Sequence, residues 1–197
     1  MPQARSDGTT VNYEDTGGHG LPVLLVHAFP LRGAMWEGQV EALSDRFRFI
    51  VPDLKGFGSS EAPDDPSQYS MDAFAAELGA VLDAADVPKA AYVGLSIGGY
   101  IAFAFFRKYA DRLTGLVLAD CKAENDPSEV IAKRTAQQEQ VKSEGTAPVI
   151  EALTGALLSE ATREKKEDVV ERTRELMDNP PAGFIGALEA MKKRPDS

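Results

Sequence analysis

The stretch AYVGLSIGGY at residues 91–100 places Ser96 between Gly94 and Gly98, behind one apolar run and ahead of another. This pattern predicts a buried strand, a tight turn at the serine and then a buried helix. A direct turn from strand to helix drives the serine toward positive φ, and the two glycines let strand and helix approach without Cβ collisions. We therefore expect the Ser96 hydroxyl at the carboxyl end of a sheet, where α/β folds bind ligands.

Ser96 then has two interpretations. On the first it is a nucleophile, and the N–H of Ile97, at the positive end of the following helix, is a donor to an oxyanion formed beside it. On the second it is an incidental serine in a glycine-rich corner of the chain. The elements on either side of this corner favour the first interpretation.

Short apolar runs alternate with helical patterns through the first 120 residues. The runs read as strands buried on both faces of a parallel sheet, because they are continuous rather than alternating. Residues 9–20 predict an edge strand and a hairpin turn. The strand runs are 21–29, 46–54, 89–96 and 113–120, and the helical segments are 35–45, 70–87 (with Ser70 as N-cap) and 98–111. The sum predicts a doubly wound α/β fold with a mostly parallel sheet.

The pattern changes after Asp120. Residues 123–197 contain no convincing strand and predict an all-helical lobe of four helices, at 127–145, 147–158, 159–179 and 180–194. We therefore divide the chain into an α/β core, residues 1–122, and a helical cap, residues 123–197.

Composition excludes several classes of function. A formal net charge of −10 argues against binding a nucleic-acid backbone, which requires clustered Lys and Arg. No apolar stretch reaches the roughly 18 residues of a membrane span, and the N-terminus lacks the apolar core of a signal peptide. The single cysteine, Cys121, excludes an internal disulfide and indicates the cytoplasm. We expect no metal and no cofactor.

Three spaced motifs resemble the α/β-hydrolase family: GLSIGG at 94–99, HAFP at 27–30 and PDLKGFGSS at 52–60. The chain is most similar to the small esterase, lactonase and cofactor-free haloperoxidase (perhydrolase) group, which includes 3-oxoadipate enol-lactonase. LVLADCKAEND at 116–126 and RPDS at 194–197 extend the resemblance over essentially the whole chain. It implies an acyl-enzyme mechanism on small carboxylic esters or lactones.

The same resemblance assigns roles to residues of the HAFP motif. The backbone N–H of Phe29 is implied as the second donor to the oxyanion, and Ala28 stands where the family usually has glycine. His27 is implied to shape this loop rather than to act as the catalytic base. Of the acidic residues, Asp53 reads as a turn former. Asp120 is either the acid of the triad, which some members place after this strand, or a cap for the next segment.

A serine nucleophile needs a histidine base and an orienting acid, yet no histidine follows His27, and His19 reads as a solvated turn residue. In the family that this chain resembles, both groups follow the helical lobe. We therefore expect that the chain is the N-terminal portion of a longer hydrolase. The expected partner is a C-terminal fragment of the same protein, either cleaved or missing. The alternatives are perhydrolase or haloperoxidase-like activity, and a non-catalytic fragment or binding module.

Overall fold

A six-stranded sheet forms the centre of the molecule in the computed structural model, which describes all 197 residues. The strands are β1 (Gln3–Ser6), β2 (Thr9–Asp15), β3 (Leu21–Val26), β4 (Phe47–Pro52), β5 (Ala90–Leu95) and β6 (Leu113–Ala119), in the order β1-β2-β4-β3-β5-β6. β1, β2 and β4 pair antiparallel, whereas β4, β3, β5 and β6 pair parallel. The mostly parallel sheet predicted from the apolar runs is confirmed.

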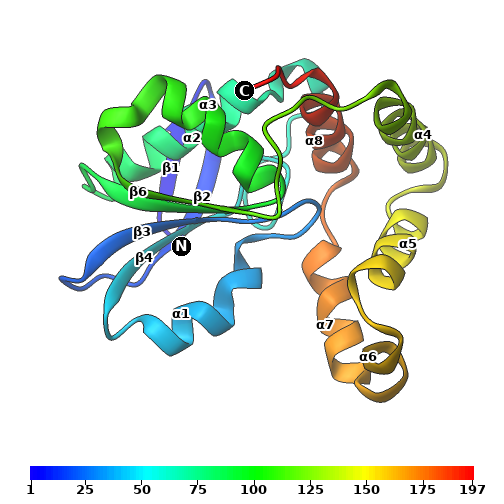
Figure 1. Ribbon diagram of the computed structural model, residues 1–197, viewed down its shortest axis with the longest axis horizontal. Coiled ribbons are helices and arrows are strands. Elements are labelled where there is room, and N and C mark those ends of the chain that lie inside the picture. The colour runs from blue at the N-terminus through cyan, green and yellow to red at the C-terminus, as the bar shows by residue number, and fades with distance from the viewer.

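Helices cover both faces of this sheet, as the crossovers between parallel strands require. α2 (Met71–Ala84) and α3 (Ile97–Tyr109) lie on one face, and α1 (Glu37–Leu43) lies on the other (Figure 1). Ser70 caps α2 by accepting a hydrogen bond from the Ala73 N–H, as predicted. Three 3₁₀ turns complete the core: η1 (Gly33–Trp36), η2 (Pro66–Gln68) and η3 (Ala110–Arg112).

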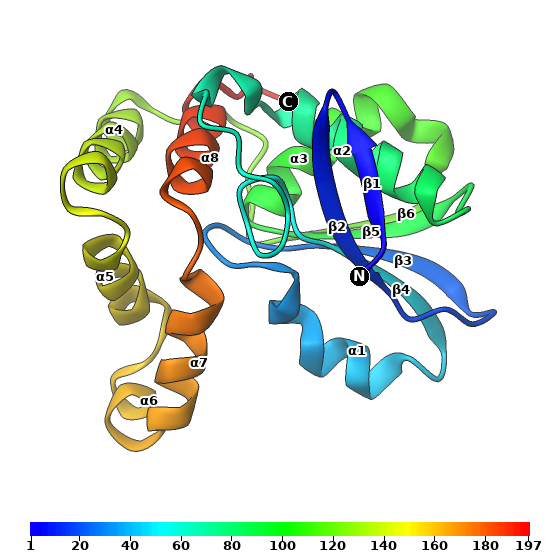
Figure 2. The same cartoon turned by 180° about the vertical axis from the view of Figure 1, so that it is seen from behind.

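The prediction that residues 9–20 hold an edge strand is wrong. β2 lies between β1 and β4, and β1 forms that edge of the sheet. A two-residue turn joins β1 to β2, with Asp7 at φ 47° and Gly8 at φ 83°. Asp-Gly is a strong hairpin signal because both positions need positive φ. Figure 2 shows this hairpin curving toward α2.

β6 differs from the expected strand buried on both faces. It is the outermost strand at the other edge of the sheet, and only β5 pairs with it. Leu116, Val117 and Leu118 are therefore 39%, 52% and 40% exposed, and Phe106 on the neighbouring α3 is 55% exposed. An apolar edge of this kind is a template for pairing with another strand.

A second apolar surface lies on the α1 side of the sheet. Hydrophobic side chains of β3, β4, β5 and α1 line a groove of about 310 Å³ whose walls are almost entirely apolar. The lining includes Leu21, Val23, Leu25, Trp36, Phe47 and Val93.

The helical lobe, defined as α4 to α8, follows β6 and lies beyond the carboxyl ends of the strands (Figures 1 and 2). Its helices are α4 (Ser128–Glu144), α5 (Ala147–Leu157), α6 (Glu160–Lys165), α7 (Glu167–Met177) and α8 (Pro181–Lys193). The structure therefore has five helices here instead of the predicted four. The predicted helix 159–179 breaks at Lys166, whose φ of −134° and ψ of 71° are not helical. No residue of α6 is buried, so packing does not hold this charged stretch straight.

Three hydrophobic clusters stabilise the molecule. The largest lies between the sheet, α2, α3 and α8, and the second lies under α1. The third lies within the helical lobe and includes Val149, Met177 and Phe184, with Phe29 and Leu31 of the core packed against it. No helix combines the length and the hydropathy that a membrane span requires.

Candidate active site

The corner between β5 and α3 has the backbone that the sequence predicts. Ser96 adopts φ 54° and ψ −111°, so the expected positive φ is confirmed. A Cβ on Gly98 would lie 2.6 Å from the Val26 carbonyl oxygen, and a Cβ on Gly94 would overlap the Gly98 carbonyl. Both positions therefore require glycine, because strand and helix backbones approach too closely for a side chain.

Hydrogen bonds hold this corner in place from two sides. The Ser96 N–H donates to the Ala119 carbonyl at the end of β6, with an N···O distance of 2.9 Å. The buried hydroxyl of Tyr92 donates to the Gly98 carbonyl at 2.8 Å. Ile97 begins α3, so its N–H has no acceptor within the helix and points toward the carboxyl end of the sheet.

The loop after β3, residues 27–31, is fixed by a buried histidine. His27 Nδ1 lies 3.0 Å from the Ala28 carbonyl oxygen, and the Leu31 N–H donates to the same oxygen at 2.8 Å. The Ala28–Phe29 peptide is trans and planar, so the Phe29 N–H points away from that oxygen. The Phe29 N–H makes no hydrogen bond within the protein. Because the peptide group is rigid, the bonds that fix the Ala28 carbonyl also fix the direction of the free Phe29 N–H.

His27 cannot act as a base for Ser96. Its side chain is fully buried, and Nε2 accepts a hydrogen bond from the Leu54 N–H at 3.0 Å. Burial lowers the pKa of His27, so the ring is neutral with the proton on Nδ1. These hydrogen bonds fit the expected loop-shaping role, which remains a prediction.

His19 and Ser96 lie at opposite ends of the parallel strands. It precedes the amino end of β3, whereas Ser96 follows the carboxyl end of the parallel neighbour β5. A strand of six residues separates these two ends by about 20 Å. The chain therefore places neither histidine within reach of the Ser96 hydroxyl.

Asp120 follows β6 with φ 45° and is exposed. With Tyr100, Cys121 and Lys122 it lines a surface cavity of about 240 Å³. It caps no helix, because α4 begins eight residues later at Ser128. The Ser96 N–H donates to the carbonyl of Ala119, the residue before Asp120. Asp120 therefore lies at the same carboxyl end of the sheet as the serine. Its role as an acid stays a prediction.

Asp53 forms the turn that the sequence predicts. Its two carboxylate oxygens accept hydrogen bonds from the Gly33 and Ser59 N–H groups, both at 2.8 Å. These bonds tie the loop after β4 to the start of η1. The carboxylate is committed to backbone donors and buried, so it is not free for acid catalysis.

Sequence reasoning missed Asn179, which joins three segments around the site. It lies between α7 and α8 and is 5% exposed. Its Nδ2 donates to the Pro30 carbonyl at 2.8 Å, and its Oδ1 accepts from the Gly58 N–H at 2.7 Å. The only sequence signal was its place before two prolines, which indicates a turn and no more.

The arrangement thus combines a half-buried serine at the carboxyl end of the sheet with free N–H groups from two loops, a geometry suited to attack on a carbonyl and to binding the resulting oxyanion. No three His, Cys, Asp or Glu side chains come together as metal ligands.

Comparisons with known proteins agree with this fold. The family described as "alpha/beta hydrolase fold" matches residues 22–183. A thermophilic esterase from Thermogutta terrifontis is 42% identical, with a TM-score of 0.90 over 100% of this chain and 72% of the esterase chain. The enol-lactonase from Burkholderia xenovorans is 26% identical, with a TM-score of 0.89 over 99% of this chain and 75% of that chain.

Among curated proteins, the non-heme chloroperoxidase of Streptomyces lividans is 38% identical over 96 residues, which are 48% of this chain and 34% of that protein. The chain spans between 34% and 42% of the length of the first curated relatives that it matches.

Proposed function

Because the chain belongs to the alpha/beta hydrolase fold family, we propose that it carries the nucleophile of a serine hydrolase acting on small carboxylic esters or lactones. The observation that carries this proposal is Ser96 at φ 54° between glycines that admit no side chain. A strained backbone of this kind persists only where the surrounding structure enforces it, and such residues cluster at active sites. Similarity to an esterase and an enol-lactonase supports the substrate class.

In the proposed reaction, the Ser96 oxygen attacks the carbonyl carbon of the ester while its proton passes to a base. The negative charge that develops on the carbonyl oxygen is bound by the N–H groups of Phe29 and Ile97. Collapse breaks the bond to the leaving alcohol, which takes up the proton, and an acyl group remains on Ser96. Water then hydrolyses this acyl-enzyme and restores the serine. Residues 1–122 form the catalytic core in this proposal, and residues 123–197 form a cap over the site.

The base comes, in this proposal, from polypeptide outside these 197 residues, and the orienting acid comes from the same polypeptide or, as the alternative, from Asp120. His27 is buried with both nitrogens bonded, and His19 lies at the opposite edge of the sheet. The unpaired edge of β6 and the apolar groove beside α1 offer surfaces on which that polypeptide packs. We propose a C-terminal fragment of the same protein as the partner, and Asp120 remains the candidate acid within this chain.

Perhydrolase activity is a second candidate on the same residues, favoured by the similarity to a chloroperoxidase. Hydrogen peroxide would replace water in attacking the acyl-enzyme, and the product would be a peracid. Adding peroxide and a carboxylic acid to the protein and assaying peracid separates this activity from plain hydrolysis.

The intact mass of the protein after incubation with a fluorophosphonate tests the proposal. We expect one adduct on the 21.2 kDa chain when a companion polypeptide is present, and no adduct on the Ser96→Ala variant. Ser67→Ala is the matched control, since Ser67 is exposed in η2, and it keeps full labelling. If a ligand stabilises the assembled protein without any labelling, the chain belongs to a binding module and the proposal is wrong.

A further inference from the structure

We propose that Asn179 is a positioning residue that holds the loop 27–31 against the core from the helical lobe, and so fixes the place of the Phe29 N–H. This inference rests on the proposed function, because the loop matters for catalysis only if it binds an oxyanion. Asn179 belongs to no motif quoted above and lies more than 80 residues from Ser96 along the chain.

The hydrogen bonds of Asn179 use every polar hydrogen and the oxygen of its side chain. Nδ2 donates to the carbonyls of Pro30 at 2.8 Å and Leu176 at 3.1 Å, while Oδ1 accepts from the Gly58 N–H. The Leu176 bond anchors the amide to its own lobe. The other two bonds reach the loop after β3 and the loop after β4. A buried and fully satisfied amide of this kind specifies one arrangement of the segments that it joins.

α8 provides a rigid base for this contact. Gly183 and Gly56 approach so closely that a Cβ on either would overlap the backbone of the other. A Cβ on Gly186 would overlap the ring of Tyr69. The first half of α8 therefore lies directly on the loop after β4, and Asn179, two residues before α8, has little freedom to shift.

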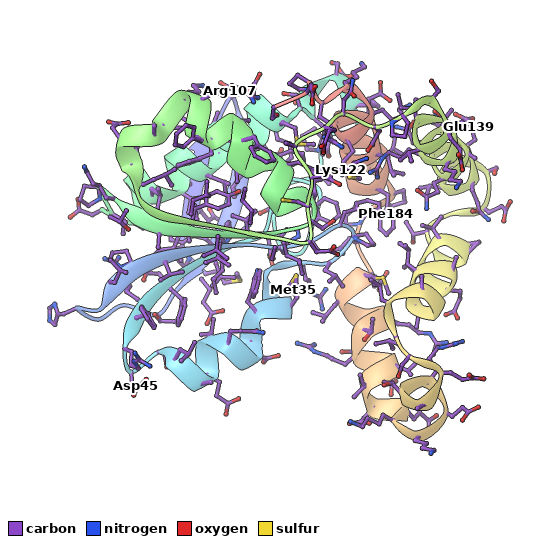
Figure 3. The ribbon with its side chains drawn as sticks, in the orientation of Figure 1. Met35, Asp45, Arg107, Lys122, Glu139 and Phe184 are labelled. Atoms are coloured by element: carbon purple, nitrogen blue, oxygen red, sulfur yellow. The ribbon has the colours of Figure 1, made fainter.

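An aromatic contact supports the same loop from the same helix. The ring of Phe184 meets the ring of Phe29 edge to face, with 5.5 Å between centroids, and Phe57 meets Phe29 at 6.2 Å. Figure 3 labels Phe184 where the helical lobe meets the core. The Phe29 side chain thus packs against Phe184 of the lobe, while the carbonyl of its neighbour Pro30 accepts a hydrogen bond from Asn179 of the lobe.

These contacts complete the restraint of the donor. His27 and the Leu31 N–H hold the peptide before Phe29, and Asn179 holds the carbonyl of Pro30 just after it. An oxyanion donor is effective only when it is fixed before the charge develops. A displacement of about 1 Å in a catalytic group costs as much as about a hundredfold in rate.

The test compares Asn179→Asp with the wild type. The aspartate keeps an acceptor for the Gly58 N–H but removes the donor to Pro30, together with the donor to Leu176 within the lobe. We expect amide hydrogen exchange at Leu31 to accelerate about fivefold, because the loop 27–31 loses the one hydrogen bond that joins Pro30 to Asn179. We expect the rate of fluorophosphonate labelling of the assembled protein to fall about tenfold. For a p-nitrophenyl ester, the fall should appear in kcat, with KM nearly unchanged.

Gln138→Leu is the matched control. Gln138 is another buried lobe amide, 5% exposed, and it donates to the Ile185 carbonyl at 2.8 Å without touching the loop 27–31. It should lose stability without altering either exchange at Leu31 or labelling. Asn179→Leu removes both bonds to the core and should exceed Asn179→Asp in both measurements.

The outcomes separate this inference from the proposed function. A wild-type protein assembled with its companion polypeptide that still resists labelling refutes the proposed function, whereas unchanged Leu31 exchange in Asn179→Asp overturns the role of Asn179. Faster exchange with wild-type labelling and kcat also overturns it, because the loop would then move without consequence. Equal effects in Gln138→Leu would reduce Asn179 to a general stabiliser of the lobe and overturn the proposal as well.

Discussion

Replacing Ser96 with glycine should stabilise the protein while removing its nucleophile. Ser96 adopts φ 54° and ψ −111°, a conformation that is strained for any residue with a Cβ. Such strain costs about 1–3 kcal/mol, and glycine relieves it. Glycine also loses more chain entropy on folding, which costs about 0.5–1 kcal/mol. The difference leaves a gain of about 1 kcal/mol in the free energy of unfolding.

For a domain of this size, that gain raises Tm by about 2–4 °C. The control is Ser96→Ala, which also removes the hydroxyl but keeps the Cβ and therefore the strain. Thermal unfolding followed by circular dichroism should place Ser96→Gly above Ser96→Ala by this interval. A Ser96→Gly variant that melts at or below Ser96→Ala would show that the corner stores no relievable strain.

Two further predictions concern the lobe and the sheet edge. Asp126 bonds Arg134 and Arg194, at 2.7 and 2.9 Å, and the Arg194 side chain is only 3% exposed. Burial alone raises the pKa of Asp126, but the hydrogen bonds and charges of the two arginines outweigh it and lower the pKa below 3.8. The ionised Asp126 therefore stabilises the fold above about pH 4, and this stabilisation is lost as the pH falls through the lowered pKa. Asp126→Asn should cost about 3 kcal/mol at pH 7, measured by urea unfolding, and should melt with less pH dependence between pH 5 and 2; an equally steep dependence in the variant would contradict this. At the edge, Val117→Lys should reduce self-association of the 197-residue chain in analytical ultracentrifugation, because a lysine blocks edge pairing; unchanged association would show that β6 is not the contact.

The corner at Ser96 and the parallel strands were predictable because their signals are local. The apolar runs and the spacing of Gly94 and Gly98 fix a strand, a turn and a helix within ten residues. The Asp7–Gly8 hairpin was equally local.

What the sequence could not provide is the pairing between distant segments. The apolar letters of β6 are the same whether its outer edge is covered or open, so its exposure follows only from the strand order. The hydrogen bonds of Asn179 join residues 121 and 149 positions apart, and no periodicity encodes such contacts. The break at Lys166 likewise depends on packing that α6 lacks.

The direct backbone contact between Gly56 and Gly183 divides the helical lobe into a constant part and a variable part. α8 cannot move closer to the core without a collision between Gly183 and Gly56. Its Phe184 therefore keeps its packing against Phe29 of the loop 27–31. α5 and α7 reach that loop through the side chains of the third cluster, and α7 also reaches it through Asn179, which bonds the carbonyls of Leu176 and Pro30. If the lobe covers the site as proposed, a combinatorial library on α5 and α7 that leaves the third cluster intact would vary the residues around the substrate while α8 keeps its contact with the core.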